Sequence, residues 1–519
     1  MVRSEMLERI GNSKDTWDFI IIGGGATGLG TAIEAASRGY RAVLIEQSDF
    51  AKGTSSRSTK LIHGGVRYLQ QGNITLVLEA LKERGTLRQN APHLVSNLPF
   101  VVPNYDWWEG PFYGIGLRVY DMLAGRHGFG HSKGLSKEKT LSYIPTLEPK
   151  GLRGGVIYYD GQFDDARLAV NMAETAAEQG ATVLNYMKAV ELIKTGDVVD
   201  GVVAEDMETG ETYTLKAKAV INATGVFTDS IRQMDDPEAE AMISPSQGVH
   251  IVLDKSFLPG QSAVMVPHTA DGRVLFAVPW HDHVIVGTTD TLVEDTPLEP
   301  RPLKEELDFL LEHAARYLTK DPAPDDVLSA FAGLRPLVSL SHDENTAAIS
   351  RDHTVHISRS GLVTITGGKW TTYRKMAEDT IDQAAMLAHL DERPSVTATL
   401  NIHGYHNHPE QFGPLAVYGA DAPAVQKVCR EEPSYGKLLH PALPTRAGEV
   451  IWAVRHEMAR TVEDVLSRRC RALLLNARAA MAMAPQVAGL MARELGKGSD
   501  WQDEQVAAFN ELAAGYLVR

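Results

Sequence analysis

The segment TSSRSTKLIHGGVRYLQ (54–70) carries many groups that bind anions at short spacing. Ser and Thr hydroxyls come first, and Lys60, His63 and Arg67 follow with two adjacent glycines between the last two. The segment has few core-forming side chains, so we expect a loop. A solvated Ser-rich surface loop is the ordinary interpretation of this composition, but it does not explain the compact grouping K-x-x-H-G-G-x-R. The spacing therefore favours a loop that recognises phosphate or a similar anion.

The residues before this loop predict the elements that position it. In DFIIIGGGATGLGTAIEAASRGYRAVLIE (18–46), the apolar run 19–22 predicts a buried parallel strand. A G-x-G-x-x-G spacing follows, then a helical stretch to about Ser37 and a second strand over 42–45. This order of strand, glycine turn, helix and strand is typical of a dinucleotide-binding unit.

Each glycine of this unit has a separate physical role. Gly23 permits the tight turn, Gly25 lets the backbone approach a pyrophosphate, and Gly28 lets the helix pack closely on the strand. The start of the helix offers free N–H groups and a positive dipole to phosphate. Glu46, at the end of the second strand, can accept hydrogen bonds from ribose hydroxyls. The unit alone does not distinguish NAD from FAD.

Two segments far downstream bear on that choice. AVINATG (219–225) is a strand that runs into a small-residue turn, and LVTITGGKWTTYR (362–374) is a strand, a Gly-Gly turn and a helix start. A helix start there could direct N–H groups at the carbonyl edge of a flavin and stabilise its reduced form. Either segment alone could be an ordinary part of an α/β sheet. Together they favour one large, discontinuous flavin domain.

Composition restricts the function further. The 519 residues carry 51 Lys and Arg against 66 Asp and Glu, a net charge of −15, which argues against non-specific nucleic-acid binding. Cys429 and Cys470 have no paired spacing, so neither a disulfide framework nor a thiolate zinc site is predicted. No secretory signal and no apolar run of membrane-spanning length is visible. We expect a cytoplasmic protein without a metal site.

Several blocks of the sequence are similar to those of a known family. They are IIIGGGATGLG (20–30), TSSRSTKLIHGGVRYL (54–69), FDDARL (163–168), INATG (221–225), VGTTD (286–290), GLRPL (333–337), TGGKWTTYRKMAE (366–378) and AVRHEMARTVEDVLSRR (453–469). The chain resembles the FAD-dependent glycerol-3-phosphate dehydrogenases of the D-amino-acid-oxidase-like superfamily. The similarity covers nearly the whole chain, and the loop at 54–69 is its most specific part. No long central insertion of the kind found in glycerophosphate oxidases is present.

The resemblance implies an α/β fold with a glutathione-reductase-like FAD-binding domain, a mixed-sheet substrate domain and a C-terminal helical domain. It implies oxidation of sn-glycerol 3-phosphate to dihydroxyacetone phosphate by hydride transfer to flavin N5. Electrons would pass to a membrane quinone. The oligomeric state stays open, with a homodimer as one alternative. The expected FAD-binding residues are Gly23, Gly25, Ala26, Thr27, Gly28, Glu46, Gln47, Thr54, Ser55, Ser56, Ser58, Lys60, Leu61, Gly64, Gly65, Ala223, Thr224, Gly225, Gly368, Lys369, Trp370 and Thr371.

A phosphate-bearing substrate also needs a cationic clamp. Arg suits this because its planar fork binds two oxygens at once and its charge is permanent. The expected clamp is Arg67 and Arg335, joined by Lys369 and by the hydroxyls of Tyr68 and Thr371. A His is suited to accept the substrate hydroxyl proton. His63 is preferred over His250 for this role, and the choice between them stays open.

The domain boundaries follow from these segments. The FAD-binding domain is predicted over 15–95, 151–235 and 342–400, and the substrate domain over 96–150 and 236–341, with a hairpin at Asp271-Gly272. Residues 401–415 are rich in His, Gly and Pro and are predicted to be a linker. The remainder, 416–519, shows amphipathic helical periods and is predicted to be the helical domain.

One segment bears on membrane association. Residues 104–130 gather aromatic and basic side chains, namely Trp107, Trp108, Phe112, Tyr113, Arg118, Tyr120 and Arg126. Such a mixture suits a peripheral contact with the inner face of the cell membrane, but it equally suits packing inside the substrate domain. Three other functions stay open: an oxidase that uses O2, a flavin amine or amino-acid oxidoreductase whose clamp binds carboxylate, and a catalytically silent flavin-binding regulator.

Overall fold

The computed structural model describes residues 1–12, 16–65, 74–107, 109–125, 128–266, 274–338 and 353–518. Several predictions fall outside these ranges. They concern Arg67 and Tyr68 of the clamp, Trp108 and Arg126 of the aromatic segment, and the hairpin signal Asp271-Gly272.

The first sheet has the strand order β17-β18-β10-β1-β2-β7. Its strands are β1 (Trp17–Ile22), β2 (Ala42–Ile45), β7 (Thr182–Leu184), β10 (Thr212–Asn222), β17 (His353–Ile357) and β18 (Val363–Gly367). The central strands pair in parallel, and β17 is an antiparallel edge strand. The antiparallel strands β8 (Met187–Thr195) and β9 (Val198–Asp206) extend from β10. The strand predicted over 19–22 and the strand predicted over 42–45 are both present.

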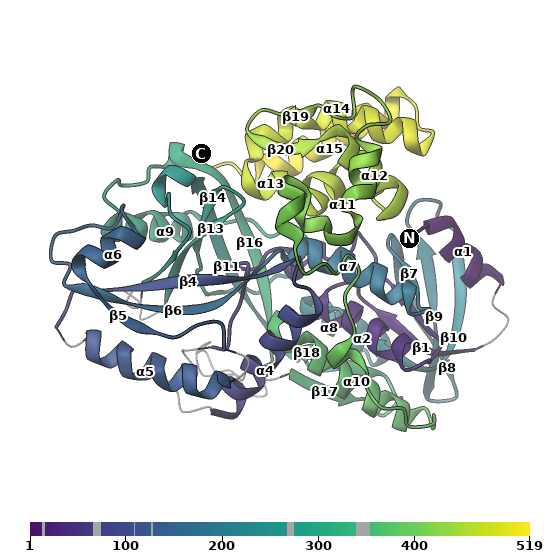
Figure 1. Ribbon diagram of the computed structural model, residues 1–519. Coiled ribbons are helices and arrows are strands. Elements are labelled where there is room, and N and C mark those ends of the chain that lie inside the picture. Colours follow the sequence, from purple (N-terminus) through teal and green to yellow (C-terminus); the bar gives the residue numbers. More distant parts are fainter. Residues whose placement is uncertain are drawn as a thin grey trace.

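Four helices pack beside the first sheet and its glycine turn. They are α2 (Ala26–Ser37), α7 (Asp165–Glu178), α8 (Thr228–Asp235) and α10 (Tyr373–Leu387). The side chains of 19–21 are fully buried, as expected for a parallel strand with helices packed against the sheet. In Figure 1 the first sheet lies at one end of the molecule, with α2 and α10 beside it.

The second sheet is mixed, as predicted, with the order β15-β11-β14-β13-β12-β4-β6-β3. Its strands are β3 (Leu61–Ile62), β4 (Val95–Asn104), β5 (Lys133–Ser136), β6 (Gly154–Phe163), β11 (Ile243–Asp254), β12 (Ala263–Val266), β13 (Leu275–Trp280), β14 (His283–Gly287), β15 (Thr291–Leu292) and β16 (Val327–Val338). Only the contact between β12 and β4 is parallel among the pairs described for this sheet.

Two strands of this sheet come from stretches that the sequence analysis assigns to the FAD-binding domain. β6 pairs with β4 along its whole length, from Val95↔Phe163 to Asn104↔Gly154, and β3 pairs with β6. The predicted boundary at 151 therefore lies before a strand of the second sheet. The reason is that antiparallel pairing joins segments about 60 residues apart, which no local pattern near 151 reveals. The domain division as a whole stays a prediction.

Helices lie on opposite faces of the second sheet. They are α4 (Ile74–Asn90), α5 (Glu109–Ala124), α6 (Lys137–Tyr143) and α9 (Lys304–Tyr317). Val101 of β4 packs in the cluster that holds Leu310 of α9, whereas Phe100 and Val102 pack in the cluster that holds Leu117 of α5. This alternation places α5 on one face and α9 on the other, as Figure 1 shows.

The C-terminal residues form a helical region with its own core. It contains α11 (Ala422–Val428), α12 (Ala447–His456), α13 (Ala472–Leu475), α14 (Ala477–Leu495), α15 (Ser499–Ala514) and the small hairpin of β19 (Leu438–His440) and β20 (Leu443–Arg446). Figure 1 shows this region as a layer above the two sheets. The N-terminal helix α1 (Arg3–Asn12), which the sequence analysis did not predict, reaches it through a hydrogen bond from the Met1 amine to the His456 carbonyl, 2.7 Å.

The stretch predicted as a linker, 401–415, is tied down by polar contacts. The two ring nitrogens of His403 lie 2.6 Å from Glu178 of α7 and 2.6 Å from Asp421. Hydrogen bonds to these carboxylates, against burial that opposes protonation, raise the pKa of His403 to about 10. The residue therefore carries a positive charge between two acidic elements.

Candidate functional site

A cavity of about 420 Å³ lies at the carboxyl ends of β1, β2, β10 and β18. This is the edge of a parallel sheet where ligands of α/β proteins bind. Many of the predicted cofactor residues line it: Gly23, Gly25, Ala26, Thr27, Glu46, Gln47, Thr54, Ser55, Ala223, Thr224, Gly225, Gly368, Lys369 and Trp370.

The glycine turn at this edge has no room for side chains. Gly23 has φ of +113°, and a Cβ there would lie 2.6 Å from the carbonyl oxygen of Ala223. A Cβ on Gly28 would lie 1.9 Å from the carbonyl oxygen of Gly23. The turn therefore brings the start of α2 directly to the strand end, and the backbone itself forms this part of the cavity wall.

The start of α2 is the anion-binding part of the wall. Gly25, Ala26 and Thr27 line the cavity, and α2 begins at Ala26 with Gly25 as its N-cap. The hydroxyl of Ser55 accepts a hydrogen bond from the Ala26 amide, 2.9 Å. The loop that carries the anion-binding groups is thereby attached to the helix start, where the dipole favours a phosphate.

Glu46 closes the wall at the end of β2. Its two carboxylate oxygens accept hydrogen bonds from the amides of Gly24, 2.6 Å, and Ser48, 2.9 Å. Burial raises the pKa of Glu46, and these two backbone hydrogen bonds oppose that effect. The carboxylate is thus held in one orientation with lone pairs left for further donors, such as ribose hydroxyls.

The turn after β18 forms the opposite wall. Gly367 and Gly368 have φ of +76° and +68°, and Lys369 and Trp370 follow on the cavity lining. The indole Nε1 of Trp370 donates to the Ser55 carbonyl, 2.9 Å, which joins this turn to the loop at 54–56. Thr371 lies buried in the short helical turn before α10 and is not among the described lining residues.

Two residues predicted to bind the cofactor point elsewhere. The Ser58 hydroxyl donates to Asp165 Oδ2, 2.7 Å, and the Lys60 ammonium contacts both Asp165 oxygens at 2.8 Å and the Ser56 carbonyl at 2.7 Å. Lys60 is fully buried, and this desolvation lowers its pKa. These side chains bind the loop to the start of α7, which the sequence could not indicate because Asp165 lies about a hundred residues away.

Five other residues predicted to bind the cofactor are also not among the described residues that line the cavity. They are Gly28, Ser56, Leu61, Gly64 and Gly65. Gly28 acts through close packing, as its distance to Gly23 shows, and Leu61 is in β3 of the second sheet. The amide of Gly64 donates to the Tyr120 hydroxyl, 2.8 Å.

Arg335 stands on β16 beside the cavity. Its neighbour Pro336 is on the lining, and β16 packs against β18, whose end carries Lys369. The guanidinium donates to the Thr288 hydroxyl, 3.1 Å, and the Thr289 carbonyl, 3.0 Å, and lies 3.2 Å from Asp290. Its side chain is 27% exposed, so the group is oriented by the VGTTD block and still reachable by an anion.

His250, on the neighbouring strand β11, is 3% exposed. Its Nε2 lies 2.8 Å from the Thr59 hydroxyl, and its ring stacks on Phe331 at 4.9 Å between centroids. Burial, followed by the charges of Arg335 and Lys60, holds the pKa of His250 well below 6.5. The imidazole is therefore neutral at neutral pH. His63 is half-buried directly after β3.

The sequence analysis did not assign a further part of the lining. These residues are Lys52, Gly53, Met187, Lys188, Ala189, Ser230, Met234, Leu298 and Pro336. Apart from Pro336, which is in the GLRPL block, they belong to none of the blocks named above. Residues 187–189 are in β8, Ser230 and Met234 in α8, and Pro336 in β16. Only for residues 187–189 could a position in the cavity wall have been inferred, because they follow a strand of the first sheet closely in sequence.

Two protein families match overlapping parts of the chain. Residues 18–374 match the family described as FAD dependent oxidoreductase, and residues 363–506 match the C-terminal domain of alpha-glycerophosphate oxidase. The cofactor is FAD, and the glycine turn, the start of α2 and Glu46 fit its phosphates and ribose. The parallel-strand edge, the glycine turn and this match define a flavin-dependent oxidoreductase.

More specific relatives cover almost all of the chain. The mitochondrial glycerol-3-phosphate dehydrogenases of Macaca fascicularis and Homo sapiens are 43% and 42% identical, over 96% of this chain and 73% of each relative. The crystal structure of glycerol-3-phosphate dehydrogenase from Bacillus halodurans, complexed with FAD, matches with a TM-score of 0.81 and 31% identity, over 99% of this chain and 97% of that one. The chain belongs to the FAD-dependent glycerol-3-phosphate dehydrogenase family.

Proposed function

We propose that this chain oxidises sn-glycerol 3-phosphate to dihydroxyacetone phosphate. The names of its relatives support this substrate. The observation that carries the proposal is Arg335, a partly exposed guanidinium oriented by Thr288 and Asp290 beside the cofactor cavity. Bound FAD supplies a hydride acceptor at N5 of its ring.

The residues of this chain bind and orient the substrate. Arg335 holds the phosphate, and Lys369 stabilises negative charge near the reacting carbon. Arg67 and Tyr68, which lie outside the described residues, and Thr371 complete the predicted clamp. A fixed clamp directs one C–H bond of the secondary alcohol at the flavin, which removes part of the entropic cost of reaching the transition state.

The hydroxyl proton needs an acceptor. A buried imidazole whose pKa lies well below 6.5 is a weak base, and His250 already contacts the Thr59 hydroxyl. His63 is less buried, so we propose it as the general base. We propose that His250 instead orients the loop at Thr59.

Anaerobic mixing of the holoprotein with glycerol 3-phosphate tests the half-reaction. We expect the flavin absorbance to bleach with glycerol 3-phosphate, and neither glycine nor proline should cause bleaching. Arg335→Met should raise the KM for glycerol 3-phosphate about a hundredfold, because a charged partner of the phosphate is lost. Arg316→Met is the matched control, since that Arg pairs with Glu312 on the exposed face of α9. An unbleached flavin, or an unchanged KM in Arg335→Met, would contradict the proposal.

We further propose a membrane quinone as electron acceptor, with the protein peripheral on the inner face of the cell membrane. Among the described residues, no helix is long and apolar enough to cross a bilayer. Figure 1 shows α5 at the margin of the molecule, away from the C-terminal region. Its sheet-facing residues Tyr113, Leu117 and Tyr120 are buried.

The other side of α5 is apolar and exposed. Trp107, Phe112, Ile115 and Met122 are 77%, 53%, 66% and 76% exposed. The three helical residues recur at intervals of three and seven, so they share one face, and Arg118 lies between them in sequence. The predicted aromatic segment thus divides: some aromatics pack in the second sheet, and the others support a surface contact.

Co-sedimentation with vesicles of anionic lipid tests this contact. Ile115→Lys should release the protein from vesicles, whereas Leu438→Lys, which replaces an exposed apolar residue of β19, should not. Turnover with a soluble quinone should exceed peroxide formation; comparable peroxide formation would identify an oxidase instead. The homodimer also stays a prediction, which sedimentation velocity tests.

A further inference from the structure

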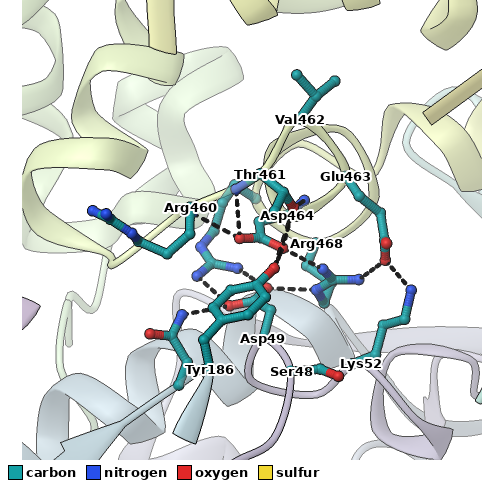
Figure 2. A network of polar contacts seen from close by, with 12 residues as sticks. Ser48, Asp49, Lys52, Tyr186, Arg460, Thr461, Val462, Glu463, Asp464 and Arg468 are labelled. Atoms are coloured by element: carbon teal, nitrogen blue, oxygen red, sulfur yellow. Dashed lines mark hydrogen bonds and ion pairs between the residues drawn. The ribbon is translucent and has the colours of Figure 1, made fainter. Parts of the chain in front are cut away.

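A network of buried charges joins the C-terminal region to the wall of the cofactor cavity. Asp49, three residues after Glu46, is fully buried and accepts hydrogen bonds from Arg468 Nε, 2.5 Å, and from both Nη atoms of Arg469, 2.5 and 2.9 Å. Figure 2 shows Asp49 and Arg468 facing one another across this boundary. The loop that carries the proposed ribose ligand is therefore bonded to a segment more than 400 residues away.

The same C-terminal segment holds a second part of the wall. The Tyr186 hydroxyl donates to Asp464 Oδ1, 2.7 Å, as Figure 2 shows, and Tyr186 directly precedes the lining residues 187–189. The Tyr186 amide also donates to the Ser48 carbonyl, 2.8 Å, and the Met187 amide to the Glu46 carbonyl, 2.7 Å. The wall segments 46–49 and 186–187 are thus bonded to each other, and both are bonded to the C-terminal segment 464–469.

A third contact completes the set. The Lys52 ammonium, itself on the cavity lining, contacts Glu463 and lies 3.2 Å from Glu299. Arg468 donates to Glu463, 2.8 Å, and to Asp464, 2.8 Å. The buried charges are paired throughout, so removal of one partner leaves others uncompensated.

The backbone geometry of the C-terminal segment is what allows these contacts. Residues 464–469 form a single π-helical turn. Such turns are rare in proteins, and those that occur are often found at functional sites. The wide turn presents Asp464, Arg468 and Arg469 toward the first sheet together.

Packing does not replace these contacts. A cleft of about 250 Å³ remains between the loop and the C-terminal region, lined by Ser48, Asp49 and Lys52 on one side and by Arg468, Gln505 and Phe509 on the other. Lys52 and Leu298 line both this cleft and the cofactor cavity. Phe50 and Ala51 of the loop are buried in the core of the first sheet, so it is toward the C-terminal region that the loop depends on polar contacts.

We propose that the C-terminal segment 460–469 is a positioning element of the FAD site. It holds the segments 46–52 and 186–189 in the arrangement that accepts the adenosine part of FAD. Docking of the C-terminal region and binding of FAD are then coupled, and by linkage each stabilises the other. If the network only stabilised the fold, its loss would lower the stability of the apoprotein and leave FAD affinity unchanged.

FAD titration of the full-length apoprotein, followed by flavin fluorescence, tests the coupling. Asp49→Asn should raise the Kd for FAD about tenfold or more. Arg455→Met is the matched control: that side chain pairs with Glu431, at 2.9 Å, and Glu494, at 2.7 Å, within the C-terminal region and outside the segment 460–469. Its Kd should stay within about twofold. Equal losses in the two variants, or an unchanged Kd in Asp49→Asn, would overturn the proposal.

A milder variant covers the case in which Asp49→Asn does not fold. Tyr186→Phe keeps the ring and removes only the hydroxyl that reaches Asp464. Its apoprotein should melt within a degree or so of wild type, and its Kd for FAD should rise about fivefold. A wild-type Kd in this variant would overturn the proposal.

Hydrogen exchange measures the reciprocal effect. FAD added to the wild-type apoprotein should slow amide exchange in peptides covering 460–469, more than in peptides from the middle of α14 in the same region. Exchange that slows in neither segment, or equally in both, would show that the C-terminal segment does not respond to the cofactor and would contradict the coupling.

Discussion

At the ends of β1 and β10 the cofactor cavity is lined by glycines and other small residues, whereas the second-sheet side of the site carries charged side chains with specific partners. Gly23 and Gly28 act by having no side chain, because a Cβ on either would collide with backbone. Arg335 and Lys60 act by having long ones, oriented by Asp290 and Asp165.

This difference separates two ways of building a site. The first side recognises a ligand through backbone amides, so its requirements are local spacing and positive φ. The second side depends on ion pairs between distant segments, so its requirements are tertiary contacts. Substitutions should therefore damage the two sides differently, through added volume on one and through lost charge on the other.

The largest effect is expected on the charged side. Lys60→Met removes the cation that pairs with Asp165, and both side chains are fully buried. The free energy of unfolding should fall by about 3–5 kcal/mol, because a carboxylate stays buried without its cation. Chemical denaturation of the holoprotein measures this.

The exposed pair of Lys304 and Asp308 on α9 gives the control, and Lys304→Met should change stability very little. The double variant Lys60→Met with Asp165→Asn should recover part of the loss, since the orphaned charge is removed. If the double variant were as unstable as the sum of its single variants, the pair would not act as a unit.

The small-residue side should respond to added volume. Gly28→Ala places a methyl group 1.9 Å from the Gly23 carbonyl, so the helix and the strand end must separate. We expect a loss of about 3 kcal/mol in unfolding free energy, together with weaker FAD binding. Gly53→Ala is the control: Gly53 lines the same cavity, but a Cβ there meets no described heavy atom within 4 Å. Similar losses in both variants would mean that cavity lining, rather than close packing, is what matters.

The same contrast explains how much the sequence could predict. The glycine turn, the strands over 19–22 and 42–45 and the turn at 368–370 are local, and each could be placed from spacing and periodicity. The family resemblance supplied Arg335, but nothing near Arg335 in sequence shows that Thr288 and Asp290 orient it. The pair of Lys60 with Asp165 and the pairing of β6 with β4 both join segments far apart in the sequence, so local spacing could indicate neither.

The neutral imidazole of His250 allows a pH test of the charged side. Its pKa in the folded protein is well below 6.5, so the unfolded chain binds a proton near pH 6.5 that the folded one refuses. Stability from this group is present above pH 6.5 and is lost as the pH falls, by about 1.4 kcal/mol per pH unit. As the pH falls below 6.5, the wild type should lose stability more steeply than His250→Gln, because only the wild type gains this proton on unfolding. Parallel stability curves for the two proteins would show that His250 is not kept neutral.

The smallest effect is expected where the two sides meet. Trp370 donates its indole N–H to the Ser55 carbonyl, 2.9 Å, and its ring contacts Phe163 edge-on. Trp370→Phe keeps an aromatic ring and removes the donor, so one hydrogen bond worth about 1 kcal/mol is lost. Because that bond joins the flavin-side turn to the anion-binding loop, the Kd for FAD should rise as the unfolding free energy falls. Trp501→Phe, on α15 in the C-terminal region, is the control and should leave FAD affinity unchanged. If Trp370→Phe lowered stability but left the Kd at the wild-type value, the two walls would bind FAD independently of each other.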